Sequence, residues 1–154
     1  MIGSVLTQEL QKIIVEDNNI QAKSNELLGA DLYVYRNIDF HKIDTRDIKT
    51  PHCNIIFGGD TEGINSVDYS VYFGFSTILD SNIIEEKTTY NDTDIKLEKV
   101  MELIIKTLKK EFEIGIGDET GFEVLSTHIE PFSQQGQDDT AFILEMEIHQ
   151  KKSC

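Results

Sequence analysis

The residues that could bind a transition metal are scattered singly along the chain: His41, His52, Cys53, His128 and His149. Protein metal sites usually present such ligands in close pairs, as in C-x-x-C or H-x-x-x-H, and neither spacing occurs here. Asp39 and Asp44 lie near His41 in the sequence, so folding could bring them into a cluster with Cys53. We nevertheless expect histidines that are exposed or hydrogen-bonded, and no metal site.

Nucleophilic catalysis and phosphate binding have no better support in the sequence. No G-x-S-x-G elbow occurs, and Cys53 lies in an apolar segment without a neighbour that would activate its thiol. Gly115, Gly117 and Gly121 follow a predicted helix, whereas the glycine loops that bind phosphate precede one. The carboxylate of Asp118 beside them would repel a phosphate.

Paired carboxylates are frequent but lie in polar segments, at Glu85-Glu86, Asp92/Asp94, Asp118-Glu119 and Asp138-Asp139. General acid–base catalysis needs a carboxyl group whose pKa burial has raised, and we expect these pairs to be solvated. Their spacing does not match a calcium-binding EF-hand loop. We therefore predict no catalytic residue, no metal and no cofactor.

The chain is acidic, because 28 aspartates and glutamates against 14 lysines and arginines give a formal net charge of −14. Like charges repel, so this balance disfavours binding to the phosphates of nucleic acids. A large net charge also keeps crowded, assembling proteins soluble. The composition therefore argues against a nucleic-acid-binding protein.

At 154 residues the chain is long enough for a single domain, 1–154, with its own core. We expect Cys53 to be a buried apolar residue and Cys154 an exposed thiol, with no disulfide framework. No apolar run approaches the roughly 20 residues of a membrane-spanning helix, and the N-terminus lacks the features of a signal peptide. The expected compartment is intracellular, without a membrane partner.

Hydrophobic periodicity predicts an α+β domain, with two principal helices on one face of a mainly antiparallel sheet of four to five strands. The helices are expected at about 2–15 and 94–112. The strands are expected at about 31–36, 52–57, 68–79, 122–129 and 140–149. A short helical turn over 23–28 would end at Gly29, and Gly58-Gly59-Asp60 would form the turn after the second strand.

The same periodicity assigns side chains to faces. We expect the first helix to bury Ile2, Val5, Leu6, Leu10, Ile13 and Ile14, and the second to bury Ile95, Val100, Met101, Leu103, Ile104, Leu108 and Phe112. On strand 68–79 the core face would carry Tyr69, Val71, Phe73, Phe75, Thr77 and Leu79, leaving Ser70, Tyr72, Gly74, Ser76 and Ile78 opposite. On strand 140–149, Phe142, Leu144, Met146 and Ile148 would face inward, and Ala141, Ile143, Glu145, Glu147 and His149 outward.

The order of these segments resembles a known family. After the opening helix come DLYVYR (31–36), PHCNIIFGGD (51–60) and DYSVYFGFSTIL (68–79). The helix KLEKVMELIIKTLKKEF and a hairpin of FEVLSTHIEPF and DDTAFILEMEIHQ follow. This arrangement is similar to that of the tail terminator, or tail completion, proteins of long-tailed bacteriophages and phage-tail-like particles. The likeness extends over nearly the whole chain.

The resemblance implies a structural, non-enzymatic virion protein. Family members form a hexameric ring on the last ring of the tail tube, stop its growth and offer a docking surface to the head or neck. The implied partners are further copies of this chain, the tail tube protein, a neck or head-completion protein and, in contractile tails, the sheath protein. DNA would meet the ring only as the genome passing through its lumen. The implied location is the head-proximal end of the tail, after assembly in the host cytoplasm.

Two hypotheses about particular residues follow from a ring. Its head-to-tail contact would lie on the small, polar face of strand 68–79 and the outward face of strand 140–149. The candidate interface residues are Ser70, Tyr72, Gly74, Ser76, Ile78, Ile143, Glu145 and Glu147. A DNA conduit benefits from weakly repulsive walls, so acids of loops 58–66 and 131–139 would face the lumen. The candidates are Asp60, Glu62, Asp138 and Asp139.

Three alternatives remain open from the sequence. One is another head–tail connector, neck or tube-like subunit, which differs in its binding partner. A second is a small-molecule-binding or hot-dog-like enzyme domain, which requires a deep apolar pocket with a convergent acid. A third is an acidic mimic of nucleic acid, which requires acids along one extended face.

Overall fold

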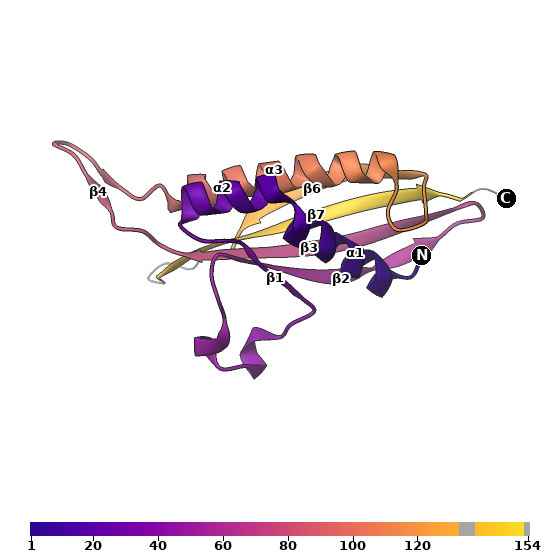
Figure 1. Cartoon of the computed structure of the whole chain (residues 1–154), viewed down its shortest axis with the longest axis horizontal. Helices are drawn as coiled ribbons and strands as arrows, with labels where there is room; N and C mark the ends of the chain where they lie inside the picture. The colour runs from indigo at the N-terminus through magenta and orange to yellow at the C-terminus, as the bar shows by residue number, and fades with distance from the viewer. Residues whose placement is uncertain (133–137, 153–154) are drawn as a thin grey trace.

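The computed structural model describes residues 1–132 and 138–152, and it confirms an α+β fold (Figure 1). In this part of the chain, the helices α1 (Gly3–Glu16), α2 (Asn18–Leu28) and α3 (Thr93–Ile114) lie on one face of a five-stranded sheet. The strands of this sheet are β1 (Tyr33–Arg36), β2 (His52–Glu62), β3 (Ser66–Ile78), β6 (Phe122–Pro131) and β7 (Asp139–Lys151). None of these helices is both long and apolar enough to cross a membrane.

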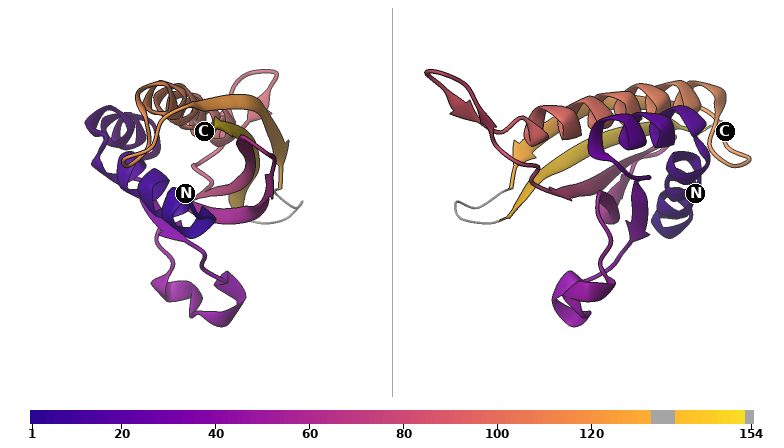
Figure 2. Two further views of the ribbon diagram at one scale, coloured as in Figure 1. Left: turned by 90° about the vertical axis from the view of Figure 1, so that its right-hand side faces the viewer. Right: turned by 60° about the vertical axis from the view of Figure 1, so that its left-hand side comes forward.

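The sheet has the order β1-β2-β3-β7-β6. The pairs β2–β3, β3–β7 and β6–β7 are antiparallel, and only the short edge strand β1 runs parallel to its neighbour β2. The long strands β3 and β7 lie at the centre and pair along their whole lengths, from Ser66–Lys151 to Ile78–Asp139. Seen end-on, the sheet curves around the helices, as an accumulated strand twist requires (Figure 2).

Alternation along β3 and β7 builds the core. Alternate side chains of β3 from Val67 to Thr77, and of β7 from Thr140 to Gln150, are buried beneath the helices. The predicted inward and outward faces of both strands are therefore confirmed, except that Leu79 lies beyond the end of β3 and is partly exposed. The helices contribute Leu6, Leu10, Ile14, Leu97, Val100, Met101, Ile104, Leu108 and Phe112.

Three of the apolar residues expected in the helical stripes are instead exposed. Ile2 precedes the first turn of α1, and Val5 lies on its solvent side. Ile95 is 53% exposed, whereas Leu97 is fully buried. Each helical residue turns by about 100°, so positions two apart lie on nearly opposite sides and cannot share one stripe.

The second helix is longer than the predicted turn over 23–28. The Asp17 side chain caps α2 by accepting a hydrogen bond from the Ile20 amide at 2.9 Å. The expected end at Gly29 is confirmed, because this glycine adopts the left-handed conformation with φ 79°. Only Ile20 and Ser24 of α2 are buried, so the hydrophobic periodicity of its sequence is weak.

The turn expected at Gly58-Gly59-Asp60 is wrong. These residues continue β2 to Glu62, and the register with β3 shifts between Phe57 and Gly59. Gly59, with φ 115°, allows this β-bulge, which bends the strand without ending it. The chain reverses later, where the Gly63 amide donates a hydrogen bond to the Ser66 carbonyl at 2.8 Å.

Two segments project from the body of the domain. Residues 37–50 leave the sheet on the side away from the helices and contain the short 3-10 turns Phe40–Lys42 and Thr45–Asp47. Strands β4 (Ile83–Ile84) and β5 (Thr89–Tyr90) pair as a small hairpin that extends beyond the end of the sheet (Figure 1). This hairpin was not predicted, because two-residue strands are too short to show alternation.

Candidate subunit-interaction surface

The surface of β3 and β7 that faces away from the helices brings the predicted interface residues together. We call this surface the open face; it carries Ser70, Tyr72, Gly74, Ser76, Ile78, Ile143, Glu145 and Glu147. Directly opposed pairs in the register are Ser70–Glu147, Tyr72–Glu145 and Gly74–Ile143. The geometry thus provides one continuous surface, and its role as an interface remains a prediction.

Polar side chains on the open face are tied to one another across the strands. The Tyr72 hydroxyl donates to Glu145 at 3.4 Å, and the Ser76 hydroxyl donates to Asp139 at 3.2 Å. These bonds orient the side chains and leave the apolar Ile143 between them on β7. The open face is therefore a mixed surface, polar toward one end and more apolar toward the start of β7.

A pocket of about 410 Å³ lies at the more apolar end of this face. We call it the open-face pocket. Gly74, Ser76 and Ile143 from the open face line it, together with His52 of β2. Aromatic side chains of Phe40, Phe75, Phe132 and Phe142 also line it. Three of the predicted interface residues therefore meet in a concave, largely apolar site, the shape that a protruding side chain of a partner could enter.

The loop over residues 37–50 forms one wall of the pocket and is fixed to the sheet. The Asn54 side chain accepts a hydrogen bond from the Ile38 amide at 3.3 Å and donates to the Ile38 carbonyl at 2.8 Å. The Tyr35 hydroxyl accepts a hydrogen bond from the Lys49 amide at 3.0 Å. These bonds hold Phe40 in an edge-on contact with Tyr35, so the wall is preformed.

The expectation that only one side of the sheet is covered is therefore incomplete. At the start of β2, residues 51–55 are all buried, because the helices cover one face and the loop over residues 37–50 covers the other. This cover was not predicted, nor were the pocket-lining positions of Phe40, His52 and Phe132. The four apolar residues of this otherwise polar loop, Ile38, Phe40, Ile43 and Ile48, are the signal that could have indicated it.

His52 is the most unusual polar residue of the pocket. It is 7% exposed, and its ring packs between Tyr35 and Phe40 with centroids 5.7 and 4.9 Å away. Its Nδ1 atom is buried and makes no hydrogen bond within the described part of the chain. Burial lowers the pKa of His52, and the negative charge of Asp139 opposes this shift. The ring is therefore a neutral, polar element in an apolar wall.

These polar groups do not form a catalytic relay. A serine nucleophile needs a base that accepts its proton, usually a histidine oriented by a carboxylate. Here the Ser76 hydroxyl donates a hydrogen bond directly to Asp139. The His52 Nδ1 atom is hydrogen-bonded to neither of these residues. The pocket is thus better suited to binding an apolar group than to acyl transfer.

The stability of the fold should fall as the pH is lowered through about 6.5, the ordinary pKa of histidine. Because burial lowers the pKa of folded His52, the unfolded chain takes up this proton more readily than the folded chain. The stabilisation is complete above the unfolded pKa and is lost as the pH falls toward the folded one. Urea unfolding at about pH 7.5 and about pH 5.5 measures the difference.

A His52→Gln variant should show a smaller pH dependence than the unmodified protein. The matched control is His128→Gln, since His128 is exposed on β6 and pairs with Glu130 at 2.8 Å. An unchanged pH dependence in His52→Gln would show that other groups cause it.

The four acids predicted to face a lumen fall into two separate groups. Asp60 and Glu62 lie on β2, opposite Tyr69 and Val67 of β3, and not in a loop. Asp139 is the first residue of β7, opposite Ile78 at the other end of β3, and Asp138 precedes it. Their nearest partners on β3, Tyr69 and Ile78, are nine positions apart, which corresponds to roughly 30 Å. They could line one channel only if β3 ran along its axis.

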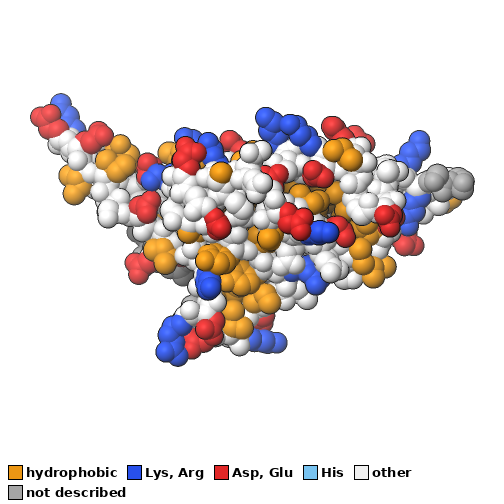
Figure 3. Space-filling model, in the orientation of Figure 1, with side chains coloured by type: hydrophobic (Ala, Val, Ile, Leu, Met, Phe, Trp, Pro, Cys, Tyr) orange, Lys and Arg blue, Asp and Glu red, His pale blue; other side chains and the backbone are white. Residues whose placement is uncertain are grey.

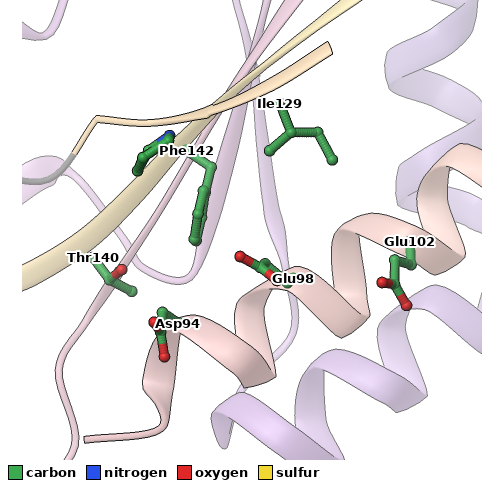
Figure 4. A pocket seen from close by; sticks show the side chains of 7 residues that line it. Asp94, Glu98, Glu102, Ile129, Thr140 and Phe142 are labelled. Atoms are coloured by element: carbon green, nitrogen blue, oxygen red, sulfur yellow. The ribbon is translucent and has the colours of Figure 1, made fainter. Parts of the chain in front are cut away.

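A second concave site lies between α3 and the edge strand β6. This groove, of about 540 Å³, has an apolar floor of Ile129, Pro131 and Phe142, with Thr140 beside them. Asp94, Glu98 and Glu102 come from successive turns of α3 and form its acidic wall (Figure 4). Among the described residues that line the groove, three are acidic and none is basic, so its chemistry favours contact with a cationic surface.

The histidines and Cys53 that were considered as possible metal ligands do not form a metal site in the described part of the chain. Among the described residues, no group of three histidine, cysteine or acidic side chains is placed to hold a metal ion. Cys53 is fully buried, as predicted, and burial raises the pKa of its thiol. Cys154, predicted to be an exposed thiol, lies outside the described residues.

Comparison of the sequence with models of protein families, and with curated proteins, gave no match. The function is therefore argued from the surface and the shape of the molecule. Those features are the open face with its pocket and the acidic groove. They also include the two projecting segments, which can be followed in Figures 1 and 3.

Proposed function

We propose that this chain is a structural subunit of a ring, and that the ring caps the head-proximal end of a phage tail tube. In this role it ends tube growth and presents an interface to the neck or head. The observation that carries the proposal is the open face, where Gly74, Ser76 and Ile143 meet in a preformed apolar pocket. The resemblance in the order of elements supplies the kind of assembly.

The arrangement of surfaces suits a head-to-tail contact. Such a contact joins two unlike surfaces of neighbouring subunits, and it closes into a ring when the rotation per subunit allows it. The open face is concave near Ser76, whereas the hairpin of β4 and β5 is convex and projects beyond the sheet. A flat, uniformly polar sheet surface would offer neither half of this contact.

The charge of the chain is compatible with a conduit for DNA. Six copies at −14 each would carry a formal charge of −84, so passing DNA would be repelled and not held. The acidic groove beside α3 offers a separate surface for a tube, neck or sheath protein with a basic edge. DNA is then a passenger in the lumen and not a ligand.

The purified protein tests the proposal directly. Negative-stain microscopy, together with mass determination by light scattering, should show a toroid with a central hole, either alone or after mixing with tail tubes. Binding at tube ends would support a terminator, while binding to the portal would indicate a neck or connector subunit. A compact protein that stays monomeric at high concentration and does not bind tube ends would contradict the proposal.

The open-face pocket supports one competing function, the binding of a small apolar molecule. It has the volume for such a ligand, and the acid Asp139 and His52 lie in its lining. This alternative expects a monomer whose melting temperature rises with an apolar ligand. If the protein binds a small ligand as a monomer, ligand binding should not depend on protein concentration. This independence distinguishes ligand binding from ring formation.

A further inference from the structure

Strand β6 forms one edge of the sheet, and its outer side is unpaired within the described part of the chain. It pairs with β7, and no backbone hydrogen bond joins its other side to a described residue. The strand has 10 residues, whereas the opposite edge strand, β1, has 4. A long edge strand presents a row of amide and carbonyl groups to which another extended chain can hydrogen-bond. The sheet can therefore grow at β6.

The register with β7 identifies the backbone groups of β6 that face outward. In an antiparallel ladder, residues that bond their partner alternate with residues whose N–H and C=O groups point away. The Phe132 amide donates to the Ala141 carbonyl at 2.8 Å, so the residues two and four positions before Phe132 also bond β7. The residues between them, Thr127, Ile129 and Pro131, therefore turn their backbone groups toward the free edge. A proline suits such a position, because the N–H that it lacks would not be used by β7.

The side chains of these outward residues face the acidic groove between α3 and β6. Ile129 and Pro131 are paired with Leu144 and Phe142, so their side chains lie on the helix side of the sheet. Ile129 is 39% exposed there. A strand added beside Ile129 would point alternate side chains into the groove, between this apolar floor and α3 (Figure 4). The free edge and the groove thus form one docking site.

The wall of the groove specifies the charge of the occupant. Asp94, Glu98 and Glu102 are exposed on α3, and none of them forms an ion pair with a described residue. Three unpaired charges of one sign beside a low-dielectric floor attract the opposite charge. Lysine and arginine fit best, because their aliphatic stems can cover an apolar floor while their charged ends reach the carboxylates.

This chain does not contain a segment with the required chemistry among its described strands. Strands β1 and β7 contain one lysine or arginine each, and the other five contain none. A second copy of this chain is therefore a poor match for the groove, and an extended, basic segment of another protein is a good one.

We propose that the acidic groove binds such a segment, which adds as a further strand to the free edge of β6. Its backbone pairs with Thr127 and Ile129, and its alternate basic side chains cover Ile129 and meet Glu98 and Glu102. The inference rests on the proposed function only for the kind of protein that carries the segment, namely a tube, neck or sheath partner. The binding mode itself follows from the edge and the groove.

A synthetic peptide of about nine residues, in which lysine alternates with valine, is the probe, since it is long enough to span most of β6. Fluorescence anisotropy at about 50 mM salt, where exposed charges are weakly screened, measures its binding to the full chain. The lysine peptide should bind saturably, and a peptide with glutamate in place of lysine should not. Binding of both peptides, or of neither up to about 1 mM, would overturn the proposal.

N-methylated peptides test backbone pairing apart from charge. One version carries N-methyl groups on the lysine amides and the other on the valine amides. An added antiparallel strand bonds β6 through its lysine residues, and a parallel one through its valine residues. One version should therefore bind at least about tenfold more weakly than the other. Equal affinities would show that charge alone attracts the peptide, which contradicts strand addition.

A pair of charge variants tests the wall of the groove. Glu98→Gln with Glu102→Gln should weaken binding of the lysine peptide roughly tenfold. The matched control is Glu111→Gln with Glu113→Gln, which changes the net charge equally in the last turn of α3, outside the groove lining. Equal weakening by the two variants would mean that net charge, and not the groove, attracts the peptide.

Hydrogen exchange measured by NMR identifies the edge residue by residue. The Thr127 and Ile129 amides should exchange rapidly in the free chain and become protected when the lysine peptide binds. The His128 and Glu130 amides bond β7 in both states and should change little. Binding without protection of Thr127 and Ile129 would overturn strand addition, and protection that rises with protein concentration without peptide would assign the edge to a second copy.

These outcomes are distinguishable from those that test the ring. Failure of the peptide experiments would remove the docking site and leave ring formation, which microscopy measures on the unmodified protein, as it stands. Peptide binding to a chain that never forms rings, alone or on tube ends, would retain the docking site and overturn the proposed function.

Discussion

Phe73→Ala should lower the free energy of unfolding by about 3–5 kcal/mol, the usual cost of removing a fully buried phenylalanine ring. Phe73 is completely buried at the centre of β3, and its ring stacks near that of Phe75 with centroids 6.4 Å apart. It also faces Leu144 of β7 across the ladder. The neighbouring strands are paired along their length, so the sheet cannot easily collapse into the resulting cavity. Urea unfolding followed by circular dichroism measures the change.

Tyr72→Ala is the matched control for this prediction. Tyr72 is adjacent in sequence and also aromatic, but its side chain lies on the open face and is only partly buried. In the isolated subunit, Tyr72→Ala should lower the free energy of unfolding far less than Phe73→Ala does. Equal losses in the two variants would mean that the assignment of faces on β3 is wrong.

Ile143→Glu should abolish ring formation while the subunit remains folded. Ile143 lines the open-face pocket and is partly exposed in the isolated chain, so a carboxylate there can stay solvated. In a ring, the same carboxylate would be buried against the neighbouring subunit without a cation to pair with. Burying an unpaired charge costs several kcal/mol. About 3 kcal/mol corresponds to a loss of at least about a hundredfold in association. Light scattering across a range of protein concentrations measures it.

Ile95→Glu introduces the same charge at an exposed isoleucine on α3, on the other side of the sheet. Rings should persist in this control. If both variants dissociate, net charge and not the open face controls assembly; if neither does, the ring uses a different surface. Circular dichroism and melting temperature confirm that each variant is folded.

The strongest periodic segments were predictable from the sequence. Strands β3 and β7 alternate over many residues, and α3 repeats its apolar stripe over several turns, so each signal is repeated enough to exceed chance. The same alternation predicts that Gly74, Ser76 and Ile143 lie on one face of the sheet. Their joint appearance in the pocket follows from register, which pairs Gly74 with Ile143.

Weakly periodic segments were not predictable. Helix α2 buries only two residues, and β4 and β5 have two residues each, so neither segment offers a pattern to recognise. The glycines of β2 indicate a turn by local chemistry, yet pairing with β3 keeps the strand extended through a bulge. In each case contacts from distant segments outweighed the local preference.

Side-chain alternation by itself determined which residues of this protein are buried under the helices and which remain on the opposite face. This follows because successive strand residues must point to opposite sides of a sheet. Only the tertiary structure decided that the loop over residues 37–50 folds back over β2, that Phe40, His52 and Ile143 share one pocket, and that the four candidate lumen acids lie at two ends of β3. Strand order and loop paths depend on contacts between residues far apart in sequence, which no local pattern encodes.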